Sequence, residues 1–97
     1  MSQPQEQVLP KRVLVVDDDE TVREVVSALL RAADFEVVVA SDGQEGMTVL
    51  GRQWFPVVVT DRKMPVLDGI EFVSRLRAIS VAPVYVIMLT AVSDAQD

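Results

Sequence analysis

The side chains best suited to chemistry in this 97-residue chain are carboxylates. Asp17 and Asp18 directly follow the apolar run Val13–Val16, and Asp61 directly follows the run Val57–Thr60. The chain has no histidine and no cysteine, which excludes Ser-His-Asp catalysis, thiolate zinc sites and acid or base chemistry by an imidazole. Any chemistry is therefore expected to come from the acids.

Several carboxylates gathered at one place predict a bound cation, because such groups stay ionised together only when a positive charge lies among them. Oxygen ligands without nitrogen or sulfur favour Mg²⁺, which commonly bridges one or two carboxylates and phosphate oxygens. That metal indicates phosphoryl chemistry. A carboxylate can act as a nucleophile and form an acyl phosphate, and we predict this role for Asp61.

The elements that must position these acids alternate between strand and helix. Short runs rich in β-branched residues are typical of buried strands, and apolar residues three or four apart are typical of helices. The expected strands cover residues 13–16, 35–40, 57–60 and 84–89, and the expected helices begin near Thr21, Asp42 and Gly69. Thr21 and Glu24 fit a capping box for the first helix.

This order of elements predicts an α/β fold, a doubly wound parallel sheet with helices on both faces. Ligands of such sheets bind beyond the carboxyl ends of the strands. Asp17, Asp18, Asp61 and Thr90 all follow or end an expected strand. We therefore expect one site to contain them.

The composition supports a single globular domain. Hydrophobic residues make up 49% of the chain and charged residues 25%, which is enough apolar material for a core. A net charge of −6 argues against direct nucleic-acid binding by this segment. We expect residues 1–10 to be a disordered leader and residues 11–97 to be the domain. No stretch approaches the roughly 20 apolar residues of a membrane span, so we expect a cytoplasmic location and no membrane contact.

Each signal also has an ordinary structural explanation. A run of acids such as Asp17–Glu20 is commonly a solvated loop that favours the start of the following helix. Asp61 by itself fits a turn or a cap, and Thr90 by itself fits a hydroxyl bonded at a strand end. Their common position at one edge of the expected sheet favours a functional site.

Three segments together resemble the receiver domain of two-component response regulators. The first is V-L-V-V-D-D-D-E at Val13–Glu20, the second is V-V-V-T-D-R-K-M-P-V-L-D-G at Val57–Gly69, and the third is P-V-Y-V-I-M-L-T-A at Pro83–Ala91. The resemblance extends from Lys11 to about Val92 in the order of the family. It implies a flavodoxin-like sheet with strand order 2-1-3-4 in the part that is present.

The resemblance also implies roles for individual residues. Asp61 looks like the phosphoacceptor, and Asp17 and Asp18 look like the acidic pair that holds Mg²⁺ together with Asp61. Lys63 matches the position that offers its backbone carbonyl to the metal, and Thr90 matches the switch hydroxyl. The implied protein is a signalling domain rather than a substrate-processing enzyme, and it receives its phosphoryl group from a sensor histidine kinase or a phosphotransfer protein.

The chain departs from the family pattern after the fourth strand. Receivers normally continue with a helix, a strand and a helix, and this sequence stops at Asp97. The family's lysine at the end of the fifth strand has no counterpart here, and residues 84–89 are expected to form an apolar edge strand. We expect a C-terminally incomplete receiver domain, either a fragment of a longer regulator or a chain whose copies pair or exchange elements.

Two other functions stay open on the sequence. One is a receiver-like interaction module that dimerises and is not phosphorylated. The other is a phosphohydrolase of the haloacid-dehalogenase type, because Asp17-x-Asp19-x-Thr21 after a strand resembles the nucleophile and acid pair of that family. Against the phosphohydrolase, the chain is short for that fold, and its M-P-x-x-D-G segment has no place there.

Overall fold

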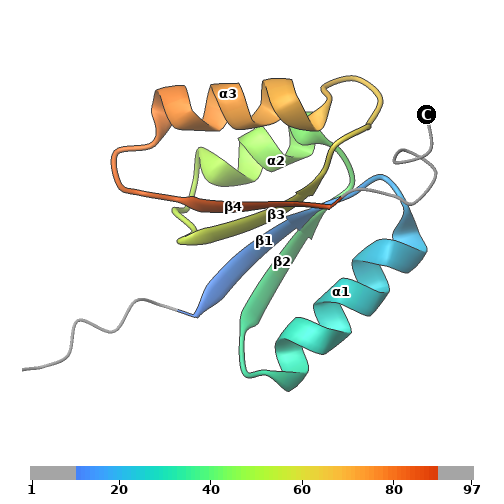
Figure 1. Ribbon diagram of the computed structural model, residues 1–97. Coiled ribbons are helices and arrows are strands. Elements are labelled where there is room, and N and C mark those ends of the chain that lie inside the picture. Colours follow the sequence, from blue (N-terminus) through green and yellow to red (C-terminus); the bar gives the residue numbers. More distant parts are fainter. Residues whose placement is uncertain (1–10, 90–97) are drawn as a thin grey trace, which may run out of the picture.

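The computed structural model describes residues 11–89 as four parallel strands and three helices. The strands lie in the order β2-β1-β3-β4 (Figure 1). This confirms the predicted fold class and strand order. In chain order the elements are β1 (Arg12–Val16), α1 (Glu20–Ala32), β2 (Glu36–Ala40), α2 (Gly43–Leu50), β3 (Val57–Asp61), α3 (Gly69–Ile79) and β4 (Tyr85–Leu89).

β1 lies inside the sheet, between β2 and β3, and is buried on both faces. Its residues alternate between two apolar clusters, because successive side chains of a strand point to opposite faces. Leu14 and Val16 belong to the cluster that includes Phe55 and Phe72. Val13 and Val15 belong to the second cluster, which also contains side chains of α1. Burial on two faces explains why the strand is a continuous apolar run.

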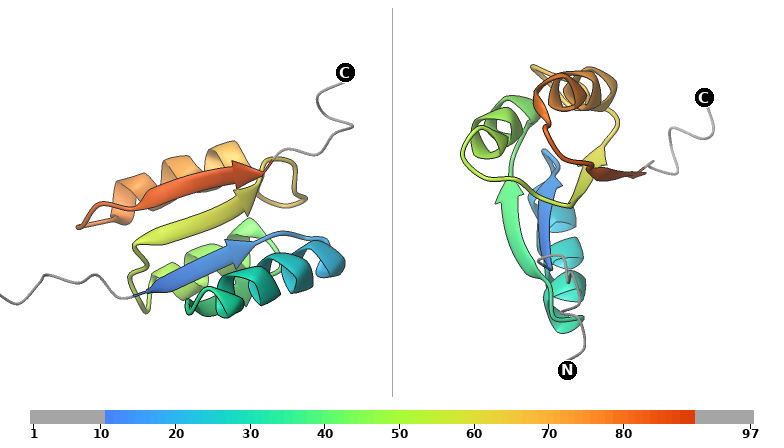
Figure 2. Two further views of the ribbon diagram at one scale, coloured as in Figure 1. Left: turned by 60° about the horizontal axis from the view of Figure 1, so that its bottom comes forward. Right: turned by 90° about the vertical axis from the view of Figure 1, so that its left-hand side faces the viewer.

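The helices cover the two faces unequally. α2 and α3 lie side by side on one face of the sheet, and α1 lies on the other, over β1 and β2 (Figures 1 and 2). Among residues 11–89, β4 is the last strand of the sheet and pairs on one side with β3. Tyr85 is 76% exposed and Ile87 is 50% exposed. The predicted apolar edge strand is therefore confirmed.

An aspartate caps the start of each helix. The carboxylate of Asp19 accepts hydrogen bonds from the amides of Thr21 and Val22, and Asp42 and Asp68 cap α2 and α3 in the same way. The predicted capping box of Thr21 is wrong. Asp19, two residues before Thr21, is an equally good capping residue and is the observed cap, so α1 begins at Glu20 and not at Val22.

Two predictions concern residues outside the described part of the chain. The expected leader, residues 1–10, is one of them, and Thr90 is the other. None of the helices between residues 11 and 89 has the length and hydropathy needed to cross a membrane.

Candidate functional site

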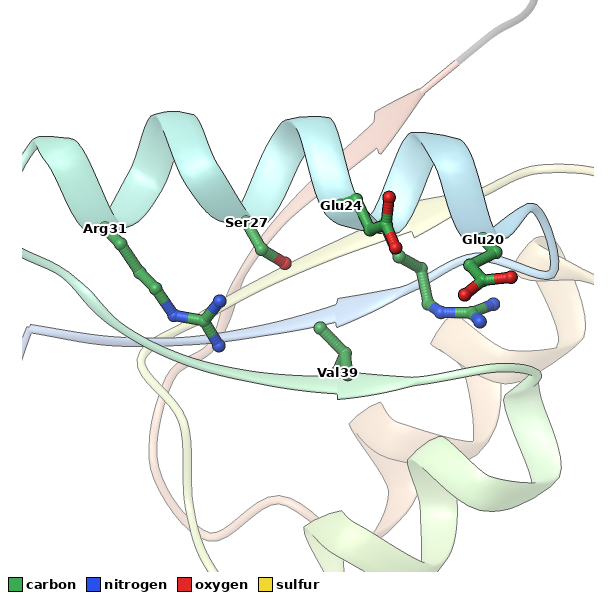
Figure 3. A pocket seen from close by; sticks show the side chains of 6 residues that line it. Glu20, Glu24, Ser27, Arg31 and Val39 are labelled. Atoms are coloured by element: carbon green, nitrogen blue, oxygen red, sulfur yellow. The ribbon is translucent and has the colours of Figure 1, made fainter.

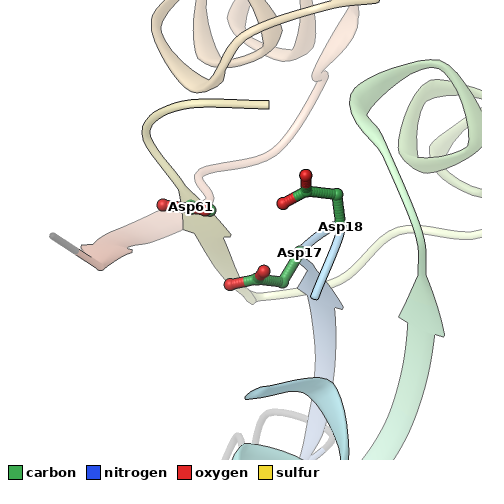
Figure 4. Close-up of side chains that lie close together, drawn as sticks. All are labelled: Asp17, Asp18 and Asp61. Atoms are coloured by element: carbon green, nitrogen blue, oxygen red, sulfur yellow. The ribbon is translucent and has the colours of Figure 1, made fainter. Parts of the chain in front are cut away.

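Three carboxylates meet at the carboxyl edge of the sheet. β1 and β3 are parallel neighbours, and Val16 lies opposite Thr60. The next residues along the two strands, Asp17 and Asp61, therefore leave the sheet side by side. Asp18 follows in the loop, and one carboxylate oxygen from each of the three residues lies within 4.8 Å of the others (Figure 4). The predicted convergence of these residues is present in the structure.

Asp17 is the most buried member of this carboxylate triad. Only 2% of it is exposed, and its Oδ1 accepts a hydrogen bond of 2.9 Å from the amide of Asp19. Burial raises the pKa of Asp17, and the nearby charges of Asp61, Asp18 and Asp19 add to the effect, while the Asp19 amide opposes it. Ionised Asp17 is therefore held in the fold at an energetic cost.

The triad has the properties of a site for a hard divalent cation. It offers oxygen ligands only, and its three negative charges are close enough to repel one another. Asp61 is half-buried, and its Oδ1 accepts a hydrogen bond of 2.7 Å from the amide of Arg62, which fixes the carboxylate at the end of β3. Asp18 is exposed, so the triad opens to solvent. A cation such as Mg²⁺ fits these residues, since it would offset the burial and the neighbouring negative charges that together raise the pKa of Asp17.

We expect Asp17→Asn to stabilise the metal-free protein and to remove its response to Mg²⁺. Because the pKa of Asp17 is raised in the fold, its ionisation lowers stability above the folded pKa, and this loss disappears as pH falls below the unfolded value. Asparagine removes the charge and keeps an oxygen for the Asp19 amide. At neutral pH, differential scanning fluorimetry should show a melting temperature about 2–5 °C higher than that of the wild type.

Added Mg²⁺ should raise the melting temperature of the wild type, because a ligand that binds only the folded state stabilises it, and it should not raise that of the variant. Glu36→Gln is the matched control. It removes one acid from an exposed position at the start of β2, away from the carboxyl edge. Equal gains in the two variants, or an Asp17→Asn protein that still responds to Mg²⁺, would contradict the proposed site.

Two other residues, Lys63 and Thr90, are predicted to belong to the site. Lys63 follows Asp61 by two residues in the loop before α3, and its side chain is exposed. The metal-binding role of its backbone carbonyl stays a prediction. Thr90 directly follows Leu89, the last residue of β4, which is opposite Asp61 in the register. Its role as a switch hydroxyl is likewise a prediction, since Thr90 lies outside residues 11–89.

Two residues of the site have contacts that the sequence did not indicate. The guanidinium of Arg23 donates a hydrogen bond of 2.7 Å to the backbone carbonyl of Asp17. Gly69 packs so tightly against the end of β3 that a Cβ atom there would overlap the carbonyl oxygen of Asp61. The sequence indicates a helix start near Gly69 but not this contact. No spacing signal marked Arg23.

The structure also distinguishes the phosphohydrolase from the receiver domain. A phosphohydrolase that uses Asp17-x-Asp19 would need both carboxylates in one site. Asp19 instead accepts the amides of Thr21 and Val22 at the start of α1. The residue that joins Asp17 and Asp18 is Asp61, from another strand. This geometry favours the arrangement expected from the receiver resemblance.

Comparisons with known proteins agree with this arrangement. Residues 13–97 match the family described as the response regulator receiver domain. The chain is 40% identical over 87 residues to a probable transcriptional regulator, ycf27, of Cyanophora paradoxa, covering 90% of this chain and 36% of that protein. It is 36% identical over 87 residues to the DNA-binding response regulator MtrA of Mycolicibacterium smegmatis, covering 90% of this chain and 37% of that protein. The chain thus spans about a third of the length of these relatives.

Solved structures give the same result. A response regulator receiver domain protein from Clostridium thermocellum superposes with a TM-score of 0.79 at 32% identity, over 91% of this chain and 70% of that one. The chemotaxis response regulator CheY4 of Vibrio cholerae superposes with a TM-score of 0.78 at 35% identity, over 92% of this chain and 76% of that one. No finding here favours the phosphohydrolase or the unphosphorylated interaction module.

Proposed function

This chain belongs to the response regulator receiver domain family, and from that premise we propose that Asp61 is its phosphoacceptor. The observation that carries the proposal is the meeting of Asp17, Asp18 and Asp61 at the carboxyl ends of β1 and β3, with one oxygen of each within 4.8 Å of the others. Three acids, one of them buried, are not expected to lie together unless a cation compensates their charges.

The proposed reaction transfers a phosphoryl group from a phosphohistidine to Asp61. A carboxylate oxygen of Asp61 forms the new O–P bond as the P–N bond of the donor breaks, and the departing imidazole takes a proton from water. The product is an acyl phosphate, and no redox change is involved. The Arg62 amide orients the Asp61 carboxylate for this step by its bond to Oδ1.

Asp17, Asp18 and Asp61, with the backbone carbonyl of Lys63, are the residues that would hold Mg²⁺. The ion would neutralise charge on the phosphoryl oxygens. Receiver domains are signalling domains rather than classical enzymes, and we propose that this chain works in that way. In the proposal, Thr90 bonds the phosphoryl group after transfer and so biases the surrounding surface toward a second conformation.

The test is the intact mass of the protein after incubation with Mg²⁺ and a small-molecule phosphodonor. We expect a single phosphoryl adduct that is lost on treatment with hydroxylamine, which cleaves acyl phosphates. Chelation of the metal before the donor is added should prevent the adduct. A protein that gains no adduct with Mg²⁺ present would overturn the proposed function.

We propose that the partner is a sensor histidine kinase or phosphotransfer protein and that the chain acts in the cytoplasm. Some relatives are named as DNA-binding or transcriptional regulators, and they are longer than this chain. With a net charge of −6, this segment is not expected to contact DNA itself. DNA binding would belong to another part of such a regulator.

We also propose that two copies pair through β4. The strand has one neighbour within residues 11–89, and its outer edge exposes unpaired backbone groups together with Tyr85 and Ile87. We expect Ile87→Lys to shift a concentration-dependent dimer to monomer, because a lysine opposes edge-to-edge pairing. Size-exclusion chromatography with light scattering measures the mass. Val81→Lys is the control, since Val81 is 98% exposed and lies outside β4. A wild type that stays monomeric at all concentrations would rule out this pairing.

A further inference from the structure

Arg23 connects the first helix to the backbone of the acidic site. It lies on α1 and lines a groove of about 260 Å³ together with Ser27 and Arg31. Figure 3 shows Ser27 and Arg31 on the side of α1 that faces β2. The Nη1 atom of Arg23 reaches back six residues and donates a hydrogen bond of 2.7 Å to the carbonyl oxygen of Asp17. A charged donor at this distance makes one of the stronger hydrogen bonds found in proteins.

The carbonyl that Arg23 holds lies where the sheet ladder ends. The amide of Asp17 still donates to the carbonyl of Ala40 in β2, at 3.1 Å. The carbonyl of the same residue lies beyond the last residue of β1, and Arg23 supplies its donor. Because a peptide group is planar, fixing this oxygen also fixes the amide of Asp18. The direction in which Asp18 leaves the strand is therefore set in part by Arg23.

The same peptide controls the spacing of two members of the carboxylate triad. The Asp17 side chain is held by the amide of Asp19 at 2.9 Å, and the Asp18 side chain follows the peptide that Arg23 fixes. Both carboxylates therefore depend on one short loop whose geometry has an anchor on α1. A metal site binds its ion more tightly when its ligands are already in place, because ordering them on binding costs free energy.

We propose that Arg23 is a positioning residue for the divalent-cation site, acting through the carbonyl of Asp17. The inference rests on the proposed function, because it deepens the assignment of Asp17 and Asp18 as metal ligands. Arg23 touches neither the metal nor the phosphoryl group in this proposal. It holds the loop that carries two of the ligands.

A purely electrostatic role for Arg23 predicts the opposite result. A guanidinium near three carboxylates repels a second cation, so its removal would tighten Mg²⁺ binding if charge were all that mattered. Removal of a positioning donor would instead weaken binding, because the Asp17–Asp18 peptide would be free to rotate. The sign of the change therefore distinguishes the two roles.

The test compares Arg23→Met with Arg31→Met by calorimetric titration of the metal-free protein with Mg²⁺. Arg31 is a matched control. It lies on the same helix, lines the same groove and donates to a backbone carbonyl, that of Val37 at 3.2 Å, but not to the acidic loop. We expect Arg23→Met to weaken Mg²⁺ binding about 10-fold and Arg31→Met to change it less than twofold. Arg23→Lys keeps a charged donor and should recover part of the affinity.

Hydrogen exchange supplies a readout that needs no metal. The amide of Asp19 is bonded to Oδ1 of Asp17, so its protection reports on the order of the loop. We expect this amide to exchange at least 10-fold faster in Arg23→Met than in the wild type or in Arg31→Met. Unchanged protection, or Mg²⁺ binding as tight as that of the wild type, would overturn the role of Arg23.

The two readouts also separate this inference from the proposed function. A wild-type protein that binds no Mg²⁺ would overturn the assignment of the metal site, and the exchange of the Asp19 amide would still decide whether Arg23 orders the loop. Weakened metal binding in Arg23→Met combined with failure of the wild type to accept a phosphoryl group would support Arg23 and overturn phosphorylation at Asp61.

Discussion

Asp61→Asn is expected to abolish the phosphoryl adduct, with at least a roughly 100-fold loss of incorporation. An amide has no negatively charged oxygen to attack phosphorus. Its shape, however, is nearly that of the carboxylate. The Asn oxygen can still accept the hydrogen bond that the Arg62 amide donates to Oδ1. The fold should therefore survive, and the loss should be one of chemistry.

Asp68→Asn is the matched control for this experiment. Asp68 lies at the end of the loop that follows Asp61, and its Oδ1 accepts a hydrogen bond from the amide of Glu71 at the start of α3. Asparagine fills this capping role about as well as aspartate. We expect its adduct to equal that of the wild type. Peptide mapping after reduction of the acyl phosphate should locate the wild-type adduct at Asp61. An adduct that persists on Asp61→Asn, for example at Asp18, would contradict the assignment of the nucleophile.

The main features of the fold and of the triad could be predicted because they depend on short-range patterns. β1 and β3 are short runs rich in β-branched residues, and an acid follows the first and ends the second. The receiver resemblance implies that these two strands are neighbours, and their parallel register, with Val16 opposite Thr60, brings Asp17 and Asp61 together. Once two strands are recognised as parallel neighbours, the side chains at their carboxyl ends have to be close.

The contacts that escaped prediction depend on geometry that has no sequence period. The bond from Arg23 to the Asp17 carbonyl joins residues six apart, across a loop and the first turn of α1. Its formation depends on where the helix starts. That start was itself misplaced, because Asp19 and Thr21 are both good capping residues and only the path of the loop decides between them. The observed cap lies two residues before the predicted one, so the prediction misplaces every side chain of the first turn.

Gly69→Ala, a substitution at the first residue of α3, is expected to destabilise the protein strongly. A Cβ atom at this position would overlap the Asp61 carbonyl oxygen and would lie 2.9 Å from Cα of Arg62 and 3.1 Å from the carbonyl carbon of Asp61. All of these atoms are backbone, so no side chain can rotate away. The Gly69 amide also donates to the carbonyl of Arg62 at 2.8 Å, which closes the loop.

Relief of this overlap requires the end of β3 to move away from the start of α3. Overpacking of a core commonly costs 1–3 kcal/mol, and with backbone on both sides we expect a loss of about 3 kcal/mol. That is a large part of the 5–15 kcal/mol by which domains are usually stable. Urea unfolding followed by Trp54 fluorescence measures it. Gly51→Ala is the control, because its nearest atoms would lie at 3.5 and 3.6 Å, which is ordinary contact.

The same displacement should reach the chemistry, because the residue that must move is the proposed phosphoacceptor. Under conditions where Gly69→Ala is still folded, we expect it to accept phosphoryl groups at least about 10-fold more slowly than the wild type, since a shift of an ångström in a reacting group costs that much or more. Gly51→Ala should react at the wild-type rate. A folded Gly69→Ala protein with the stability and rate of Gly51→Ala would show that the close approach of α3 to β3 does not hold Asp61 in place.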